Sequence, residues 1–220
     1  MSIKNSLLKI KSSLPENVTL VAVSKTKPVS DLIEAYNAGQ RIFGENKIQE
    51  MAEKFEQMPK DIEWHMIGHV QTNKVKFMAP FVSLIHAVDS LKLLEEINKQ
   101  ALKNNRIIDC LLQIHIAEEE TKFGMDDAEL QELLQSADFA QMQNIRITGL
   151  MGMATFTDDE NQVNKEFKHL KASYEKLSEK PETLNLKPET LSMGMSGDYK
   201  IAIACGSTMI RIGSSIFGGR

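Results

Sequence analysis

The feature that most constrains the fold of this chain is a regular succession of short apolar runs, each followed by a longer segment with helical periodicity. Several of the runs are apolar at consecutive positions, which is typical of parallel strands covered on both faces. Helical signals mark the intervening segments; Ser30, for example, is a plausible cap and Gly39 a plausible stop. The β-prone runs lie at 18–24, 41–44, 63–68, 82–88, 107–116, 145–151, 190–194 and 209–213.

About eight strands alternating with about eight helices in 220 residues predict a single (β/α)8 barrel. A doubly wound open sheet is the alternative, but no G-x-G-x-x-G motif follows the first run and no P-loop is present. We interpret the polar stretch 178–192 as a loop before the seventh strand, and we expect one domain spanning residues 1–220. An extra amphipathic helix is expected before the first strand, with one face formed by Ile3, Leu7, Leu8 and Ile10.

Composition excludes several classes of partner and location. The net charge of −4 and the scattered lysines argue against nucleic-acid binding, and no stretch is apolar enough to span a bilayer. The N-terminus lacks the features of a secretory signal, so we expect a cytoplasmic protein in which Cys110 and Cys205 are buried free thiols. His65 and His69 stand four apart, but WHMIGH predicts a strand and a turn, so we expect no shared metal ion.

A barrel places chemistry just beyond the C-terminal ends of its strands, with phosphate held after strands seven and eight. Two elbows rich in glycine and serine occupy those places, MGMSGD and IGSS. Ser196 can offer its hydroxyl, while Gly213 and Ser214 can offer backbone N–H groups where a final helical turn begins. We therefore predict a phosphate cradle; the alternative is a pair of structural turns.

The first expected strand ends in SKTKP, which contains a candidate reactive amine. Val21, Val23 and Lys25 share one side of the strand by parity, so Lys25 follows two core side chains into the barrel mouth. Desolvation at such a place lowers the pKa of a lysine, and the neutral amine forms Schiff bases. Lys27 precedes Pro28, which directs it beyond the strand. We prefer Lys25; the alternative is that both lysines are ordinary exposed residues.

Two further polar residues accompany these strand ends. Arg211 lies inside an otherwise apolar run, and a buried arginine must be paired or stacked. Its guanidinium either forms a structural ion pair across the barrel or faces a ligand. Asn46, in FGEN after the second run, is either a helix cap or a polar contact in the mouth.

The segments VAVSKTKP, FGENKIQE, WHMIGHVQTNK, GLMGMA and LSMGMSGDYKIAIACGSTMIRIGSSIFGGR resemble the YggS/PROSC family of pyridoxal phosphate homeostasis proteins. The resemblance runs from about Leu20 to Gly218 and implies a TIM barrel similar to the N-terminal domain of alanine racemase, with pyridoxal 5′-phosphate (PLP) as cofactor. Ser214 stands where many members have threonine, which preserves the hydroxyl. The resemblance implies Lys25 as the Schiff-base lysine, Ser196, Gly213 and Ser214 as the phosphate cradle, Arg211 near the pyridine nitrogen and Asn46 near the cofactor.

These residues also limit the chemistry that we expect. Arginine only donates, so Arg211 cannot protonate the pyridine nitrogen, and an unprotonated ring is a weaker electron sink. Racemisation needs a second-face acid or base, which alanine racemase takes from a further domain for which 220 residues leave no room. The tyrosines Tyr36, Tyr174 and Tyr199 lie in helical patterns. We therefore expect no enzyme, or at most weak PLP-dependent activity.

The resemblance implies a protein that buffers free PLP and supplies it to apo-enzymes, and so affects amino-acid and keto-acid balance. One alternative is a PLP-dependent amino-acid racemase with weak activity. The other is a cofactor-free Schiff-base aldolase or sugar-phosphate isomerase that uses the same lysine and cradle. We expect a monomer that binds PLP and contacts apo PLP-dependent enzymes transiently, without binding nucleic acid, a membrane or a metal ion.

Overall fold

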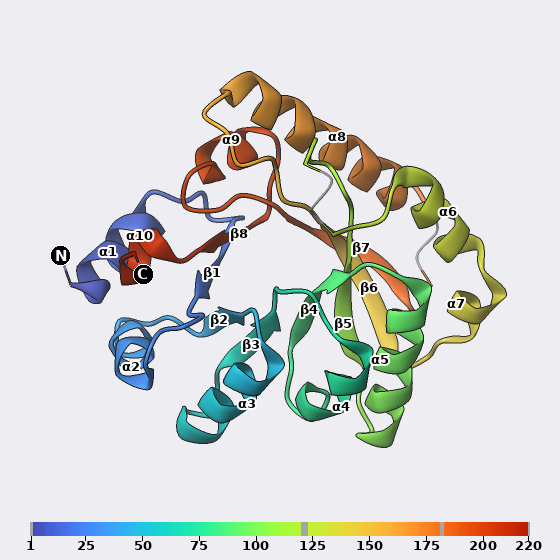
Figure 1. Ribbon diagram of the computed structural model, residues 1–220, viewed down its shortest axis with the longest axis horizontal. Helices are drawn as coiled ribbons and strands as arrows, with labels where there is room; N and C mark the ends of the chain where they lie inside the picture. Colours follow the sequence, from blue (N-terminus) through green and yellow to red (C-terminus); the bar gives the residue numbers. More distant parts are fainter. Residues whose placement is uncertain (1, 120–122, 181–182, 220) are drawn as a thin grey trace.

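Eight parallel strands close into one barrel in the computed structural model, which describes residues 2–119, 123–180 and 183–219. Each strand pairs with the next along the chain, and the last pairs with the first, so the expected barrel is confirmed and the open sheet is wrong. Figure 1 shows the strands inside a ring of helices. The strands are β1 (Thr19–Val23), β2 (Ile42–Glu45), β3 (Glu63–Met66), β4 (Leu84–Val88), β5 (Ile108–Gln113), β6 (Ile145–Met151), β7 (Leu186–Ser192) and β8 (Met209–Ile212).

The helices begin where side chains can accept hydrogen bonds from the first free N–H groups. Ser90 caps α5, Asp126 and Glu129 form a capping box on α6, and Asp159 caps α8. The expected cap at Ser30 is wrong, because α2 already begins at Val29. The helices are α1 (Ile3–Ser12), α2 (Val29–Asn37), α3 (Ile48–Gln57), α4 (Val75–Met78), α5 (Leu91–Lys103), α6 (Asp127–Gln135), α7 (Ala137–Gln141), α8 (Glu160–Ser178), α9 (Tyr199–Ala204) and α10 (Ser214–Phe217), with a 3-10 turn η1 (Thr72–Lys74).

The extra N-terminal helix, α1, packs against α2 and α10, which brings the two ends of the chain close together (Figure 1). Leu7 and Ile10 are buried on this face, and Ile3 packs against the core. Leu8 was expected on the same face but is 44% exposed. It follows Leu7 by one position, and one residue turns a helix by about 100°.

The seventh strand starts earlier than the sequence indicates. Within the stretch 178–192, which we interpreted as a loop, β7 begins at Leu186, while residues 181–182 lie outside the described part of the chain. Gly149 on β6 explains how this polar strand docks. A Cβ at Gly149 would lie 1.7 Å from the carbonyl oxygen of Thr190, so only glycine permits this approach.

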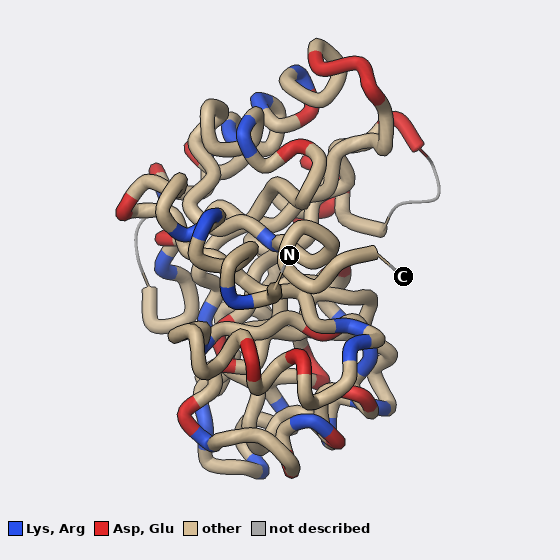
Figure 2. Tube along the Cα trace, turned by 90° about the vertical axis from the view of Figure 1, so that its left-hand side faces the viewer, with Lys and Arg blue, Asp and Glu red and all other residues tan. Residues whose placement is uncertain are grey.

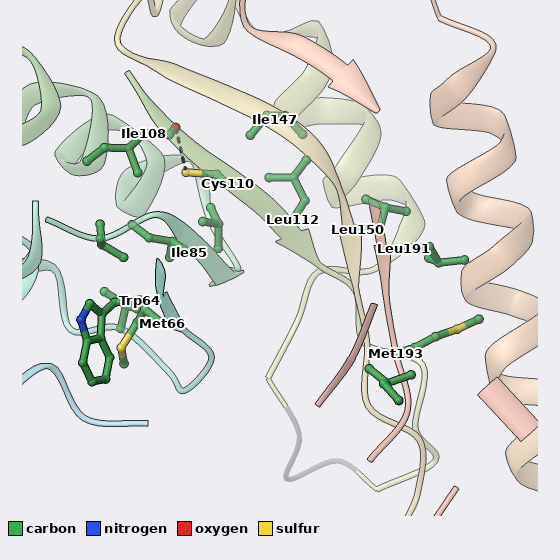
Figure 3. Packing of buried hydrophobic residues seen from close by; sticks show 14 of the residues in the cluster. Trp64, Met66, Ile85, Ile108, Cys110, Leu112, Ile147, Leu150, Leu191 and Met193 are labelled. Carbon is green, nitrogen blue, oxygen red and sulfur yellow. Dashed lines mark hydrogen bonds between the residues drawn. The ribbon is translucent and has the colours of Figure 1, made fainter. Parts of the chain in front are cut away.

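Buried side chains form two layers, one on each face of the barrel wall. Leu20 and Ala22 belong to a large cluster, whereas Val21 between them belongs to a small one. The small cluster draws on strands all round the barrel and therefore fills its interior. Figure 3 shows Trp64 and Cys110 among the side chains of the large cluster. The interior cluster comprises Val21, Leu84, Ala87, Leu111, Met151 and Met209.

Two expectations drawn from composition, on the cysteines and on membrane-spanning helices, can be compared with the described residues. Cys110 and Cys205 are both buried and free, as expected, and burial raises the pKa of the Cys110 thiol. No helix in the described ranges has the length and apolar character needed to cross a bilayer. Figure 2 shows lysines and arginines interspersed with acidic residues along the chain.

Candidate functional site

The turn after β1 carries Lys25 into a cavity of about 590 Å³ at the carboxyl ends of the strands. Lys25 is half-buried there, and Asn46 from the turn after β2 lines the same cavity. The two residues lie together because β1 and β2 are parallel neighbours whose carboxyl ends open on one rim. The other lining residues are Thr26, Lys27, Pro28, Asp31, Lys47, Glu50 and Gly219.

The structure distinguishes between the two roles expected for Asn46, a helix cap and a polar contact in the barrel mouth. The N-cap of α3 is Lys47, with no side-chain capping bond, so Asn46 is not the helix cap. Its backbone touches the turn after β3, since a Cβ at Gly68 would lie 2.4 Å from the Asn46 carbonyl oxygen. Glycine at that position lets the turn close over the backbone of Asn46, whose side chain lies at the cavity.

The two elbows, MGMSGD after β7 and IGSS after β8, lie side by side. The backbone N–H of Ser215 donates to Oγ of Ser196 at 3.5 Å. Gly213 is the N-cap of α10, and a Cβ there would lie 3.2 Å from the carbonyl oxygen of Val23 at the end of β1. Lys27 also ties the β1 turn to this region, because its ammonium donates to the carbonyl oxygen of Phe217 at 3.1 Å.

The predicted site residues therefore fall into three neighbouring groups rather than one cavity. Lys25 and Asn46 line the 590 Å³ cavity, whose lining does not include the other four. Ser196 belongs to the paired elbows, as do Gly213 and Ser214. Arg211 lies inside the barrel on β8.

Arg211 is buried, and its guanidinium has two neutral acceptors. Nη1 donates to Oγ of Ser192 at 2.6 Å, and Nη2 donates to the carbonyl oxygen of Gly152 at 3.0 Å. Burial lowers the pKa of Arg211 to about 10, so the group stays charged at neutral pH. Within the described residues both acceptors are uncharged, so these two bonds are not an ion pair. The charge of Asp198 acts in the opposite direction to burial and raises the pKa of Arg211.

Two buried histidines extend this network, and the sequence analysis missed both as site residues. Nδ1 of His86 lies 3.0 Å from Oγ of Ser192, and Nε2 of His86 lies 3.0 Å from Nδ1 of His65. Burial lowers the pKa of His65 to about 3 and that of His86 well below its ordinary value. Strand parity was the available signal, because β3 and β4 pair with His65 opposite Leu84, two residues before His86.

His65 and His69 do not converge. His65 points into the barrel, whereas His69 is exposed, lies 3.2 Å from Asp89 and stacks on Phe123. Among the described residues no group of three or more histidine, cysteine or acidic side chains could hold a metal ion.

Both neighbours of Lys25 are anchored to carboxylates outside the barrel wall. Ser24 donates its hydroxyl to Oε1 of Glu45 at 2.6 Å, and the backbone N–H of Thr26 donates to Oε1 of Glu50 at 2.6 Å. Thr26 has a φ of +62°, which is costly for a β-branched residue and persists only when its surroundings enforce it. The two carboxylates therefore hold the turn that presents Lys25.

Lys54 on α3 joins these two carboxylates. Its ammonium lies 2.7 Å from Oε1 of Glu45 and 2.8 Å from Oε1 of Glu50, and it also donates to the carbonyl oxygen of Ser24. Burial raises the pKa of Glu45, and its hydrogen bonds with Lys54 and Ser24 oppose that rise. The sequence analysis missed this triad, although Glu50 and Lys54 show the helical i, i+4 spacing of an ion pair.

Replacing Lys54 with methionine should destabilise the fold, because Glu45 would keep a buried charge without a counterion. We expect Lys54→Met to lower the free energy of unfolding in urea by about 3–5 kcal/mol. The matched double variant Glu45→Gln/Lys54→Met removes both charges and should recover part of that loss. A double variant less stable than Lys54→Met would show that the lone carboxylate is not the cause.

Because of His65, the free energy of unfolding should decrease as the pH is lowered. The unfolded imidazole takes a proton at its ordinary value of 6.5, whereas the buried one resists until about pH 3. The contribution is therefore complete above pH 6.5 and is lost as the pH falls toward 3. Between pH 7 and pH 5 it amounts to about 2 kcal/mol. In urea unfolding, the free energy of unfolding of His65→Gln should decrease less between pH 7 and pH 5 than that of the wild type. The exposed control His69→Gln should show the wild-type decrease. Equal decreases in all three proteins would contradict this assignment.

Comparison with known proteins places this geometry in a family. The family model for the alanine racemase N-terminal domain matches residues 1–220. A pyridoxal phosphate homeostasis protein of Aquifex aeolicus is 38% identical over 202 residues, covering 91% of this chain and 86% of the relative. One from Escherichia coli K12 is also 38% identical, over 217 residues that cover 94% of this chain and 87% of that protein.

Solved structures agree with these relatives. PipY of Synechococcus elongatus, solved with PLP bound, has a TM-score of 0.87 and 35% identity and covers 98% of this chain and 100% of its own. Alanine racemase from E. faecalis has a TM-score of 0.78 over 100% of this chain and 58% of its own, and its 17% identity shows a shared fold alone. The chain therefore belongs to the alanine racemase N-terminal domain family and to the pyridoxal phosphate homeostasis proteins.

Proposed function

We propose that this protein binds PLP as a Schiff base on Lys25, and buffers and supplies the cofactor in the cytoplasm. The observation that carries the proposal is the placement of Lys25 and Asn46 on one cavity, beside two paired elbows rich in N–H and hydroxyl groups. The relatives bear the name pyridoxal phosphate homeostasis protein, and PipY is described with PLP bound.

The residues present suit the functional groups of PLP. The cofactor supplies an aldehyde and a conjugated ring when bound. Lys25 would hold the cofactor at its aldehyde carbon through a C=N bond, whose formation releases one water. Ser196 would bind the phosphoester through its hydroxyl, and Gly213 and Ser214 through backbone N–H groups at the start of α10. Asn46 would contact the cofactor from the cavity wall.

Arg211 sets the character of the site as a holder rather than a catalyst. Its guanidinium stays charged and only donates, so it would leave the ring nitrogen unprotonated. An unprotonated ring withdraws electrons weakly, which disfavours carbanion chemistry. We therefore propose at most weak PLP-dependent activity, from one PLP-binding domain across residues 1–220 that acts as a monomer and meets apo PLP-dependent enzymes transiently.

Covalent labelling tests the site directly. Loaded protein should show visible absorption, and borohydride reduction followed by peptide mass mapping should place the label on Lys25. Lys25→Ala should abolish the label, whereas Lys47→Ala, a lysine on the same cavity, should retain it. A label on Lys27 would overturn the assignment, and a protein that stays colourless with PLP would favour the cofactor-free aldolase.

Supply is a separate claim with its own measurement. A reversible C=N bond can exchange with an incoming amine, so loaded protein should activate an apo PLP enzyme faster than an equal amount of free PLP. The same assay with borohydride-reduced protein should show no activation, because reduction makes the bond permanent. Activation no faster than by free PLP would count against delivery and leave buffering alone.

A further inference from the structure

One continuous chain of buried polar side chains crosses the barrel interior from β3 to β8. It runs from His65 through His86 and Ser192 to Arg211, with successive distances of 3.0, 3.0 and 2.6 Å. All four side chains are buried, His86 and Ser192 completely. Polar groups buried in this way cost free energy unless every hydrogen bond is made, and a cluster of apolar side chains shares the interior with them.

The donor inventory gives the chain a direction. Arginine only donates, so Ser192 accepts from Arg211 and has one hydroxyl proton of its own to donate. Among the described residues the partner for that proton is Nδ1 of His86, which must then be unprotonated. His86 consequently carries its proton on Nε2 and donates it to Nδ1 of His65. Donation runs from the arginine to His65.

We propose that Ser192, His86 and His65 are positioning residues that fix the direction of the Arg211 guanidinium toward the ring nitrogen of bound PLP. This inference rests on the proposed function. Nδ1 of His86 accepts a hydrogen bond from the Ser192 hydroxyl, so the oxygen of Ser192 presents a lone pair to Nη1 of Arg211. Gly152 holds Nη2 from β6, and the backbone N–H of Arg211 is bonded to Gly194 at 2.9 Å.

The arrangement leaves part of the guanidinium for a ligand. The two described bonds use two of its five N–H donors, one on each terminal nitrogen. A guanidinium held at both terminal nitrogens cannot rotate away, so its remaining donors keep one direction. Without the proton acceptor at His86, the hydroxyl of Ser192 could turn its proton toward Arg211 and lose the bond.

The first test needs no cofactor. Nitrogen-15 NMR of the cofactor-free protein reports which imidazole nitrogen carries the proton. We expect neutral imidazoles protonated at Nε2 in both His65 and His86. A proton on Nδ1 of His86 would reverse the chain and overturn the proposal.

The second test uses the loaded full chain and PLP labelled with nitrogen-15 in its ring. Ser192→Ala should shift the ring-nitrogen resonance, because Arg211 loses its hydrogen bond to the Ser192 hydroxyl. The variant should also release PLP roughly tenfold faster, the effect of losing one hydrogen bond to a charged group. Borohydride should still label Lys25. Ser207→Ala is the matched control, since Ser207 is also buried and its described side-chain hydrogen bonds go to the backbone carbonyls of Leu191, Met193 and Met209. The control should leave the resonance unchanged.

A variant pair at His86 covers the case in which Ser192→Ala does not fold. The amide oxygen of His86→Gln can still accept the hydroxyl proton, whereas His86→Leu cannot. We expect glutamine to preserve more of the wild-type resonance than leucine. An unchanged resonance in folded, Lys25-labelled His86→Leu would refute the positioning role. Wild-type protein without a Lys25 label would instead refute the proposed function.

Discussion

The pairing of β8 with β1 is the constraint on which the site depends. These strands come from opposite ends of the chain, and their hydrogen-bonded register sets Val21 beside Arg211. Closure therefore brings the turn that carries Lys25 against the elbow at Gly213, where a Cβ would lie 3.2 Å from the Val23 carbonyl oxygen, a tight contact that glycine avoids. An open sheet would leave these strands as two distant edges. A site of this composition consequently exists only in the closed barrel.

Two buried polar networks flank the barrel wall near the proposed site. Outside the wall, Glu45 and Lys54 hold the neighbours of Lys25 through ion-pair and hydrogen-bond contacts. Inside the wall, His86 and Ser192 support Arg211. Each network costs desolvation energy that an apolar barrel would not incur. Their shared consequence is rigidity, because the neighbours of Lys25 and the guanidinium of Arg211 are held by hydrogen bonds that are already made.

An arginine in the barrel interior beside two elbows rich in N–H and hydroxyl groups suits retention of a cofactor better than carbanion chemistry on it. A permanent donor opposite a ring nitrogen holds the ring without drawing electrons from it, because arginine does not release its proton. A nest of N–H groups and hydroxyls binds an anion by preformed geometry. The combination is consistent with the reversible carrier that we propose, and the chain is similar to pyridoxal phosphate homeostasis proteins.

The sequence by itself determined the architecture and the local character of each strand end. Alternating apolar runs and helical patterns predicted the barrel, and SKTKP, MGMSGD and IGSS stood out because turn and donor chemistry is encoded within a few residues. Strand boundaries that depend on neighbours were missed, as at the polar start of β7, where docking against Gly149 outweighs propensity. Only the tertiary structure decided that His65 and His86 meet Ser192, and that Glu45 and Lys54 hold the Lys25 turn. Those contacts join residues 9 to 106 positions apart, and such distances are fixed by strand register and helix docking rather than by local spacing.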